Sequence, residues 1–195
     1  KDSAKVLENA GVELISPKFA NTNVDLPALP AEAYRLVTDR ETYGIMDIGG
    51  DDRGAYALGR YTPFIKEENN YRMAFVANCY RPLTSTVDDA IEIMREIEAA
   101  CGLHFTCIVN NSNIGRETTR EAFLDSLGFA EALSEKTGLP IWLHTVEEGL
   151  AAGMPDIPVM PLKLQKKYFD LFGIPSGVLY NIQSDKDFMP KSWQS

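Results

Sequence analysis

The chain has 195 residues and a formal net charge of −9, with 45% hydrophobic and 24% charged residues. This composition is ordinary for a globular protein, and the length is sufficient to bury a sizeable core. The acidic balance argues against a nucleic-acid-binding surface, because phosphate binding depends on clustered Lys and Arg. We find no apolar run of transmembrane length, no signal peptide and no C-x-x-C pair among three cysteines, so we expect a cytoplasmic protein with reduced thiols.

The first part of the chain mixes short helical and extended patterns. Helical spacing predicts a helix over residues 1–10, ended by Gly11, and a short strand over residues 12–15. The proline- and asparagine-rich residues 17–30 predict a loop, and Pro30 begins a short helix that follows it.

The functional interpretation centres on the stretch from Tyr43 to Gly59. Residues 44–48 predict a buried strand that contains Asp47, and two glycines directly after it open a loop. In open α/β sheets, ligands bind at the carboxyl ends of the strands. A carboxylate there suits a Walker-B site that holds Mg²⁺ through water, with the glycine loop sensing a γ-phosphate. The alternative is a strand that ends in a polar turn, because Asp and Gly are common turn residues.

The second half repeats one pattern, in which an apolar strand, a polar loop and an amphipathic helix lead through Gly-Leu to the next strand. Short connections in this order predict parallel strands with right-handed crossovers. The predicted fold class is therefore α/β, doubly wound, with helices on both faces of a mainly parallel sheet. We expect strands at 73–78, 105–109 and 139–146, and helices from 84–86 to Cys101 and from 118–119 to about Lys136.

The tail is less regular. Residues 162–172 form an amphipathic pattern that we interpret as a closing helix packed on the sheet. A basic amphipathic helix that lies on a membrane surface is the alternative. We divide the chain into an α/β domain over residues 1–152 and a carboxyl-terminal helix and tail over residues 153–195.

The order of these motifs resembles the ParA/MinD/CobQ-type P-loop ATPases, the deviant-Walker branch, and most closely a bacterial group of small ATP-binding members. No single motif is specific, and the likeness rests on their order and spacing. The stretches that carry it are MDIGGDDRGAYALGRY, NCYRPLTSTVDDAIEIMREIE, CIVNNSN and LPIWLHTVEEGLA.

The family's phosphate-binding loop is absent, since no Gly-Lys-Ser or Gly-Lys-Thr occurs in the 195 residues. The resemblance implies that this loop, with the first strand and helix, precedes Lys1. We therefore expect a truncated chain that lacks its first β-α unit and that by itself binds ATP weakly or not at all.

The resemblance implies catalytic roles around the glycine loop. Asp47 matches the carboxylate that holds Mg²⁺ through water, and Gly49 and Gly50 match the loop that meets the γ-phosphate. Asp51 and Asp52 are placed either to position water or as solvated loop charges. Arg81 is placed to face a phosphate or to form a surface ion pair.

The resemblance also implies a base-binding site. Asn110 matches the position whose amide contacts adenine, with Asn111 beside it, and its alternative is a turn-forming Asn at a strand end. Thr145 and Val146 match the loop that flanks the base. The two histidines, His104 and His144, are interpreted as core or edge residues.

Two functions follow as expectations. The first is an ATP-binding switch and Mg²⁺-dependent ATPase, when complete, whose partners are the nucleotide and a second copy or another protein. The second is an α/β protein-interaction module without catalysis or nucleotide binding.

Overall fold

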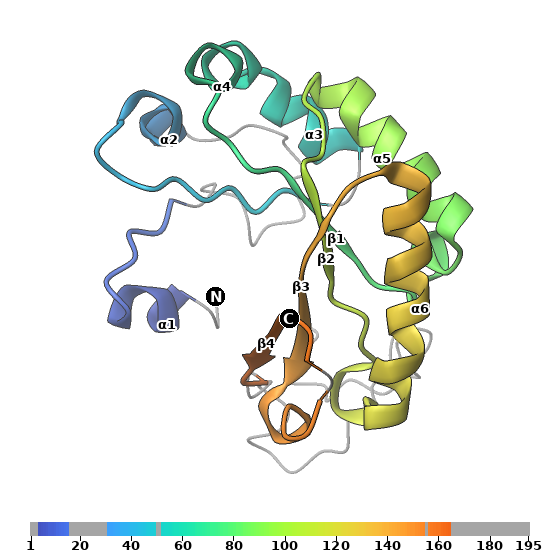
Figure 1. Cartoon of the computed structure of the whole chain (residues 1–195). Coiled ribbons are helices and arrows are strands. Elements are labelled where there is room, and N and C mark those ends of the chain that lie inside the picture. Colours follow the sequence, from blue (N-terminus) through green and yellow to red (C-terminus); the bar gives the residue numbers. More distant parts are fainter. Residues whose placement is uncertain (1–3, 16–30, 50–51, 155, 165–195) are drawn as a thin grey trace, which may run out of the picture. The chain divides into compact units, whose positions relative to one another are not determined.

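The computed structural model describes residues 4–15, 31–49, 52–154 and 156–164 (Figure 1). Contacts divide the chain into two units, one of residues 1–13 with 164–195 and one of residues 14–163. In the first unit, helix α1 (Ala4–Asn9) ends before Gly11, whose φ of 76° lies in the left-handed region. Glycine adopts this conformation without strain, so the predicted helix end is confirmed.

In the second unit, the residues before the sheet form short helices. Two predicted strands, one of them at the boundary between the two units, are wrong. Residues 12–15 and 43–49 are irregular, and the side chains of Tyr43 and Ile45 are almost fully exposed. A strand exists only where a neighbouring strand takes its backbone hydrogen bonds, and no described strand pairs with either segment. The short helices are η1 (Ala31–Tyr34), α2 (Arg35–Thr38), α3 (Asp52–Gly59) and α4 (Thr62–Glu68).

Helix α3 also corrects the prediction of a glycine loop that runs to Gly59. The chain is helical from Asp52, and Ala55 and Leu58 of this helix are buried in the core. Ala55 and Leu58 are three residues apart and share one face of the helix, so burial of this face stabilises α3 after the two glycines.

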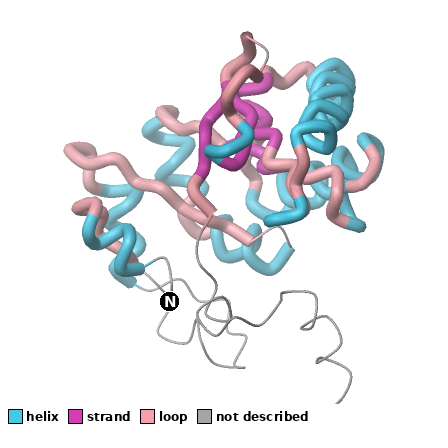
Figure 2. The backbone as a smooth tube through the Cα atoms, turned by 90° about the horizontal axis from the view of Figure 1, so that it is seen from below, coloured by secondary structure: helices cyan, strands magenta, loops and turns pink. Residues whose placement is uncertain are grey.

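The centre of this unit is a parallel sheet in the order β1-β2-β3-β4. The strands run side by side in Figure 2, and every pairing is parallel. The three predicted strands of the second half are confirmed as β1, β2 and β3, whereas β4 was not predicted. Their bounds are β1 (Ala74–Ala77), β2 (Cys107–Asn110), β3 (Ile141–Glu147) and β4 (Val159–Leu162).

Strand β4 extends the sheet beyond residue 152, and Leu162 ends a strand where the amphipathic pattern predicted the start of a helix. Residues 165–172 of that pattern lie outside the described residues, so the closing helix and the membrane contact through residues 162–172 stay predictions. Within the described ranges, no helix combines the length and apolarity that a membrane crossing requires.

Helices α5 (Val87–Cys101) and α6 (Arg120–Thr137) connect the first three strands and lie on the same side of the sheet (Figure 1). Their ends match local signals. The hydroxyls of Thr86 and Thr119 each accept a hydrogen bond from a backbone N–H in the first turn. Gly102 and Gly138 follow the last turns with φ of 72° and 73°.

The main core lies between the sheet and these helices. Phe75 and Phe105 meet edge to face with ring centroids 5.2 Å apart. Ala90 on α5 and Leu133 on α6 are fully buried against the same cluster. Short connections, η2 (Pro82–Thr84), η3 (Gly115–Glu117) and η4 (Glu148–Leu150), lie next to the carboxyl ends of the strands. This edge contains most of the predicted base-binding residues.

Candidate functional site

The carboxyl ends of β1 and β2 are joined by a network of asparagine side chains. Asn78 Nδ2 donates to the carbonyl of Asn113 at 3.1 Å, and Asn78 Oδ1 accepts from the backbone N–H of Asn113 at 3.3 Å. The hydroxyl of Ser112 accepts from the backbone N–H of Cys79 at 3.1 Å. The loops after two neighbouring strands are therefore held in one arrangement by side chains.

Asn110, the last residue of β2, is fully buried and points toward α6. Its Nδ2 donates to Ser126 Oγ at 3.0 Å and lies 3.2 Å from His144 Nδ1, while its Oδ1 accepts from the backbone N–H of Ser112. Every polar atom of this amide thus has a partner inside the protein. In this arrangement Asn110 presents no free group to a base.

Asn111 has a different environment. Its side chain is half-buried, and its Oδ1 accepts a hydrogen bond from the hydroxyl of Thr145 at 2.5 Å. Thr145 and Val146 are both buried in β3. The structure therefore brings the predicted base-binding residues Asn111 and Thr145 into direct contact, whereas Val146, the next residue of β3, faces the opposite side of the sheet.

The predicted catalytic residues lie in the irregular segment before α3. Asp47 and Gly49 are exposed. Gly50 and Asp51 lie outside the described residues, and only the backbone of Asp52 is described. Among the described residues, no hydrogen bond or ion pair connects Asp47 with the asparagine network. Of the predicted catalytic residues that the structure describes, Asp47 and Gly49 therefore have no described hydrogen bond or ion pair with the base-binding residues.

The described ranges contain no group of three His, Cys, Asp or Glu side chains arranged to hold a metal ion. Mg²⁺ usually takes only one or two carboxylates and keeps waters or phosphate oxygens as its other ligands. The exposed carboxylate of Asp47 suits this mode as a single ligand.

The connection after β3 is held to α6 by an arginine that the sequence analysis did not select. The Arg120 guanidinium donates to the carbonyl of Ala152 at 3.0 Å and also to that of Gly153. Tyr80, in the loop after β1, donates its hydroxyl to the carbonyl of Ala122 at 2.6 Å. No short sequence motif predicts the contacts of Arg120 and Tyr80, because each contact joins elements that are far apart in the sequence.

Burial changes the acid–base behaviour of two of these side chains. Burial lowers the pKa of His144, with Glu131 acting weakly in the opposite direction. Burial raises the pKa of Tyr80, so its hydroxyl is protonated at neutral pH and donates as described. His104 is exposed, and its Nδ1 lies 3.5 Å from a carboxylate oxygen of Glu98.

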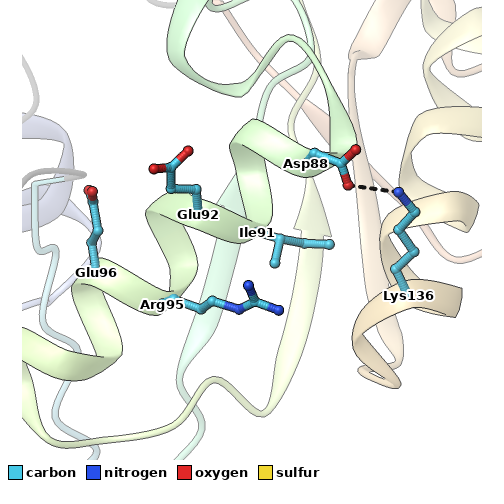
Figure 3. Close-up of a pocket in the computed structure, with 6 residues that line it drawn as sticks. All are labelled: Asp88, Ile91, Glu92, Arg95, Glu96 and Lys136. Atoms are coloured by element: carbon cyan, nitrogen blue, oxygen red, sulfur yellow. Dashed lines mark hydrogen bonds and ion pairs between the residues drawn. The ribbon is translucent and has the colours of Figure 1, made fainter.

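A separate hollow of about 560 Å³ lies between α5 and α6 (Figure 3). Asp88 and Lys136 approach each other across it at 2.7 Å, and both side chains are more than half exposed. An exposed ion pair contributes little to stability or specificity. The remaining lining residues are Ile91, Glu92, Arg95 and Glu96, and none belongs to the predicted site.

Comparisons with protein-family models, with curated proteins and with solved structures give no match for this chain. The fold and the carboxyl-edge residues define an α/β protein with a parallel sheet and a side-chain network at the edge where such sheets bind ligands. The likeness to ParA/MinD-type ATPases stays a prediction.

Proposed function

We propose that this protein is a nucleotide-dependent switch of the ParA/MinD type that binds ATP with Mg²⁺ and hydrolyses it slowly. The observation that supports the proposal is the polar network at the carboxyl edge of β1, β2 and β3, where Asn111 contacts Thr145. Parallel α/β sheets place their ligands at this edge. The finer assignment to a doubly wound P-loop fold belongs to the same proposal.

The residues divide into two groups by task. At the carboxyl edge, Asn111 binds the base, and Thr145 contacts Asn111 from β3. In the segment before α3, Asp47 holds Mg²⁺ through water, and the backbone of Gly49 and Gly50 meets the terminal phosphate. Bound Mg²⁺ supplies charge neutralisation on the phosphate oxygens.

The 195 residues contain no Gly-Lys-Ser or Gly-Lys-Thr loop, so the test uses the protein expressed from the natural start codon of its gene. Calorimetric titration with Mg²⁺-ATP measures binding to this protein and to the 195-residue chain alone. We expect binding by the first and weak or no binding by the second. Absence of binding by both would overturn the nucleotide function and favour the interaction module.

Asp47→Asn tests the catalytic assignment, because it keeps the size of the side chain and removes its charge. We expect loss of Mg²⁺-dependent ATP hydrolysis. Glu41→Gln is the matched control, since Glu41 is also exposed and lies just before the same segment. Unchanged hydrolysis in Asp47→Asn would contradict the assignment.

A further inference from the structure

The connection between β3 and β4 differs from the other two crossovers of the sheet. Parallel strands are usually joined by an α-helix that packs an apolar face on the sheet. Here residues 148–158 make the connection, and the helical turn among its described residues is the short η4. None of residues 148–154 and 156–162, which are the described part of this connection together with β4, is buried. Regions with few buried apolar contacts open at a lower free energy than the core of a protein.

Arg120, the first residue of α6, holds this connection at its turn. In Figure 1 the connection passes beside the start of α6. The guanidinium donates through Nη1 to the carbonyl of Ala152 at 3.0 Å and through Nη2 to the carbonyl of Gly153. A charged donor forms stronger hydrogen bonds than a neutral one, and a planar guanidinium can form two at once. One side chain therefore fixes two consecutive peptide units to α6.

The positions of both partners fit this contact. The helix dipole favours acidic residues in the first turn of a helix and opposes a cation there. Arg120 therefore does not stabilise the start of α6, and its contribution comes from the contact with the connection. Gly153 has a φ of 70°, in the left-handed region that glycine adopts without strain. This conformation belongs to the turn whose carbonyls Arg120 binds.

We infer that Arg120 is a latch, a positioning residue that keeps the connection on α6 and thereby keeps β4 paired with β3. When the latch is released, the connection and β4 open together while β1 and β2 stay paired. Opening breaks the hydrogen bond that the backbone N–H of His144 donates to the carbonyl of Pro158 at 2.8 Å. It also uncovers the outer edge of β3 along His144–Glu147, the stretch that pairs with β4. This device does not depend on the proposed nucleotide function.

Hydrogen exchange, measured residue by residue by NMR on the protein expressed from its natural start codon, tests the latch. The N–H of His144 reports opening of the connection. The N–H of Asn111, which donates to the carbonyl of Ala77 at 2.8 Å, reports on the pairing of β1 with β2. In Arg120→Ala we expect exchange at His144 to accelerate about tenfold or more, as for the loss of one or two hydrogen bonds. Exchange at Asn111 and the midpoint of urea unfolding should stay unchanged.

Gly153→Ala releases the connection from its other side. Alanine is strained at a φ of 70°, so the closed turn is disfavoured although Arg120 is still present. We expect exchange at His144 to accelerate by roughly tenfold in this variant too, again without a change at Asn111.

Tyr80→Phe is the matched control. It removes the hydrogen bond that the Tyr80 hydroxyl donates to the carbonyl of Ala122 at 2.6 Å, in the first turn of the same helix. Tyr80 belongs to the loop after β1, so exchange at His144 should not change.

Three results would overturn the inference. The first is unchanged exchange at His144 in both Arg120→Ala and Gly153→Ala. The second is equal acceleration at His144 and Asn111 together with a lower urea midpoint, because Arg120 would then support the whole fold. The third is an acceleration at His144 in Tyr80→Phe as large as in Arg120→Ala, because the effect would then belong to the start of α6 and not to the latch.

Discussion

Asn110 Nδ2 lies 3.2 Å from His144 Nδ1, and both side chains are buried between the sheet and α6. An amide nitrogen can only donate, so Nδ1 of His144 accepts and the neutral ring carries its proton on Nε2. The ring of Phe123 meets that of His144 edge to face, with centroids 6.2 Å apart. In the structure Asn110 is therefore a buried core residue, whereas the family resemblance implied that it contacts a base.

Asn110→Ala should destabilise the fold more than Asn111→Ala. The first change leaves His144 Nδ1 and Ser126 Oγ without the donor they share, at a cost of about 2–3 kcal/mol in the free energy of unfolding. The second removes a half-buried side chain and the acceptor of the Thr145 hydroxyl, and should cost about 1 kcal/mol. Urea denaturation of both variants checks this. Equal stabilities would show that Asn110 is not a core residue.

Stability should fall below about pH 6.5, in part because of His144. Burial lowers the pKa of His144 in the folded protein below its ordinary value of 6.5. The unfolded chain therefore binds the proton first as the pH decreases. The contribution of neutral His144 to the free energy of unfolding is fully present above pH 6.5, and it is lost as the pH falls toward the pKa of the folded protein.

Urea denaturation at several pH values between neutral and mildly acidic conditions measures this effect in the wild type and in His144→Gln. The variant does not titrate there, so its stability should depend less steeply on pH. His104→Gln is the control, because the side chain of His104 is 82% exposed. A steeper loss in His104→Gln than in the wild type, or an unchanged slope in His144→Gln, would contradict the prediction.

Two leucines on α6 should respond very differently to truncation. Leu133 is fully buried in the core cluster, so Leu133→Ala removes buried methyl groups and leaves a cavity. We expect a loss of about 2–5 kcal/mol. Leu124→Ala changes a side chain that is 36% exposed and should cost less than about 1 kcal/mol. Thermal and urea unfolding of the two variants would show whether α6 packs as described.

Two glycine-to-alanine changes should have opposite signs. Gly102 follows α5 with a φ of 72°, and a Cβ there would lie 3.7 Å from Thr62 Cγ2, so strain rather than a clash opposes alanine. We expect a loss of about 1–2 kcal/mol. Gly128 is exposed within α6 and has open space around it, so Gly128→Ala should stabilise by roughly 0.5–1 kcal/mol. A stabilising Gly102→Ala would contradict the left-handed conformation.

The helices of the second half were predictable because their signals are local. A threonine at each start and a glycine after each end are enough to place α5 and α6 within a residue or two. The apolar strands between them follow from the same repeat, and consecutive parallel strands follow from the short connections.

Residues 44–48 and β4 were not predictable in this way. The apolar composition of the first favours a strand, yet a strand depends on pairing with a neighbour, and the described sheet has β1 paired only with β2. Strand β4 contains Pro161 and is only four residues long, so its pattern is weak. Its place is decided by pairing with β3.

By itself, the sequence determined the α/β class, the limits of the long helices and the gathering of asparagines after the strands, because these depend on near neighbours in the chain. Only the tertiary structure decided which asparagine faces the core. Alternation along β2 turns Asn110 toward Ser126 and His144 and turns Asn111 toward Thr145. That choice depends on which side of the sheet α6 covers, and it arises from contacts between residues far apart in the sequence.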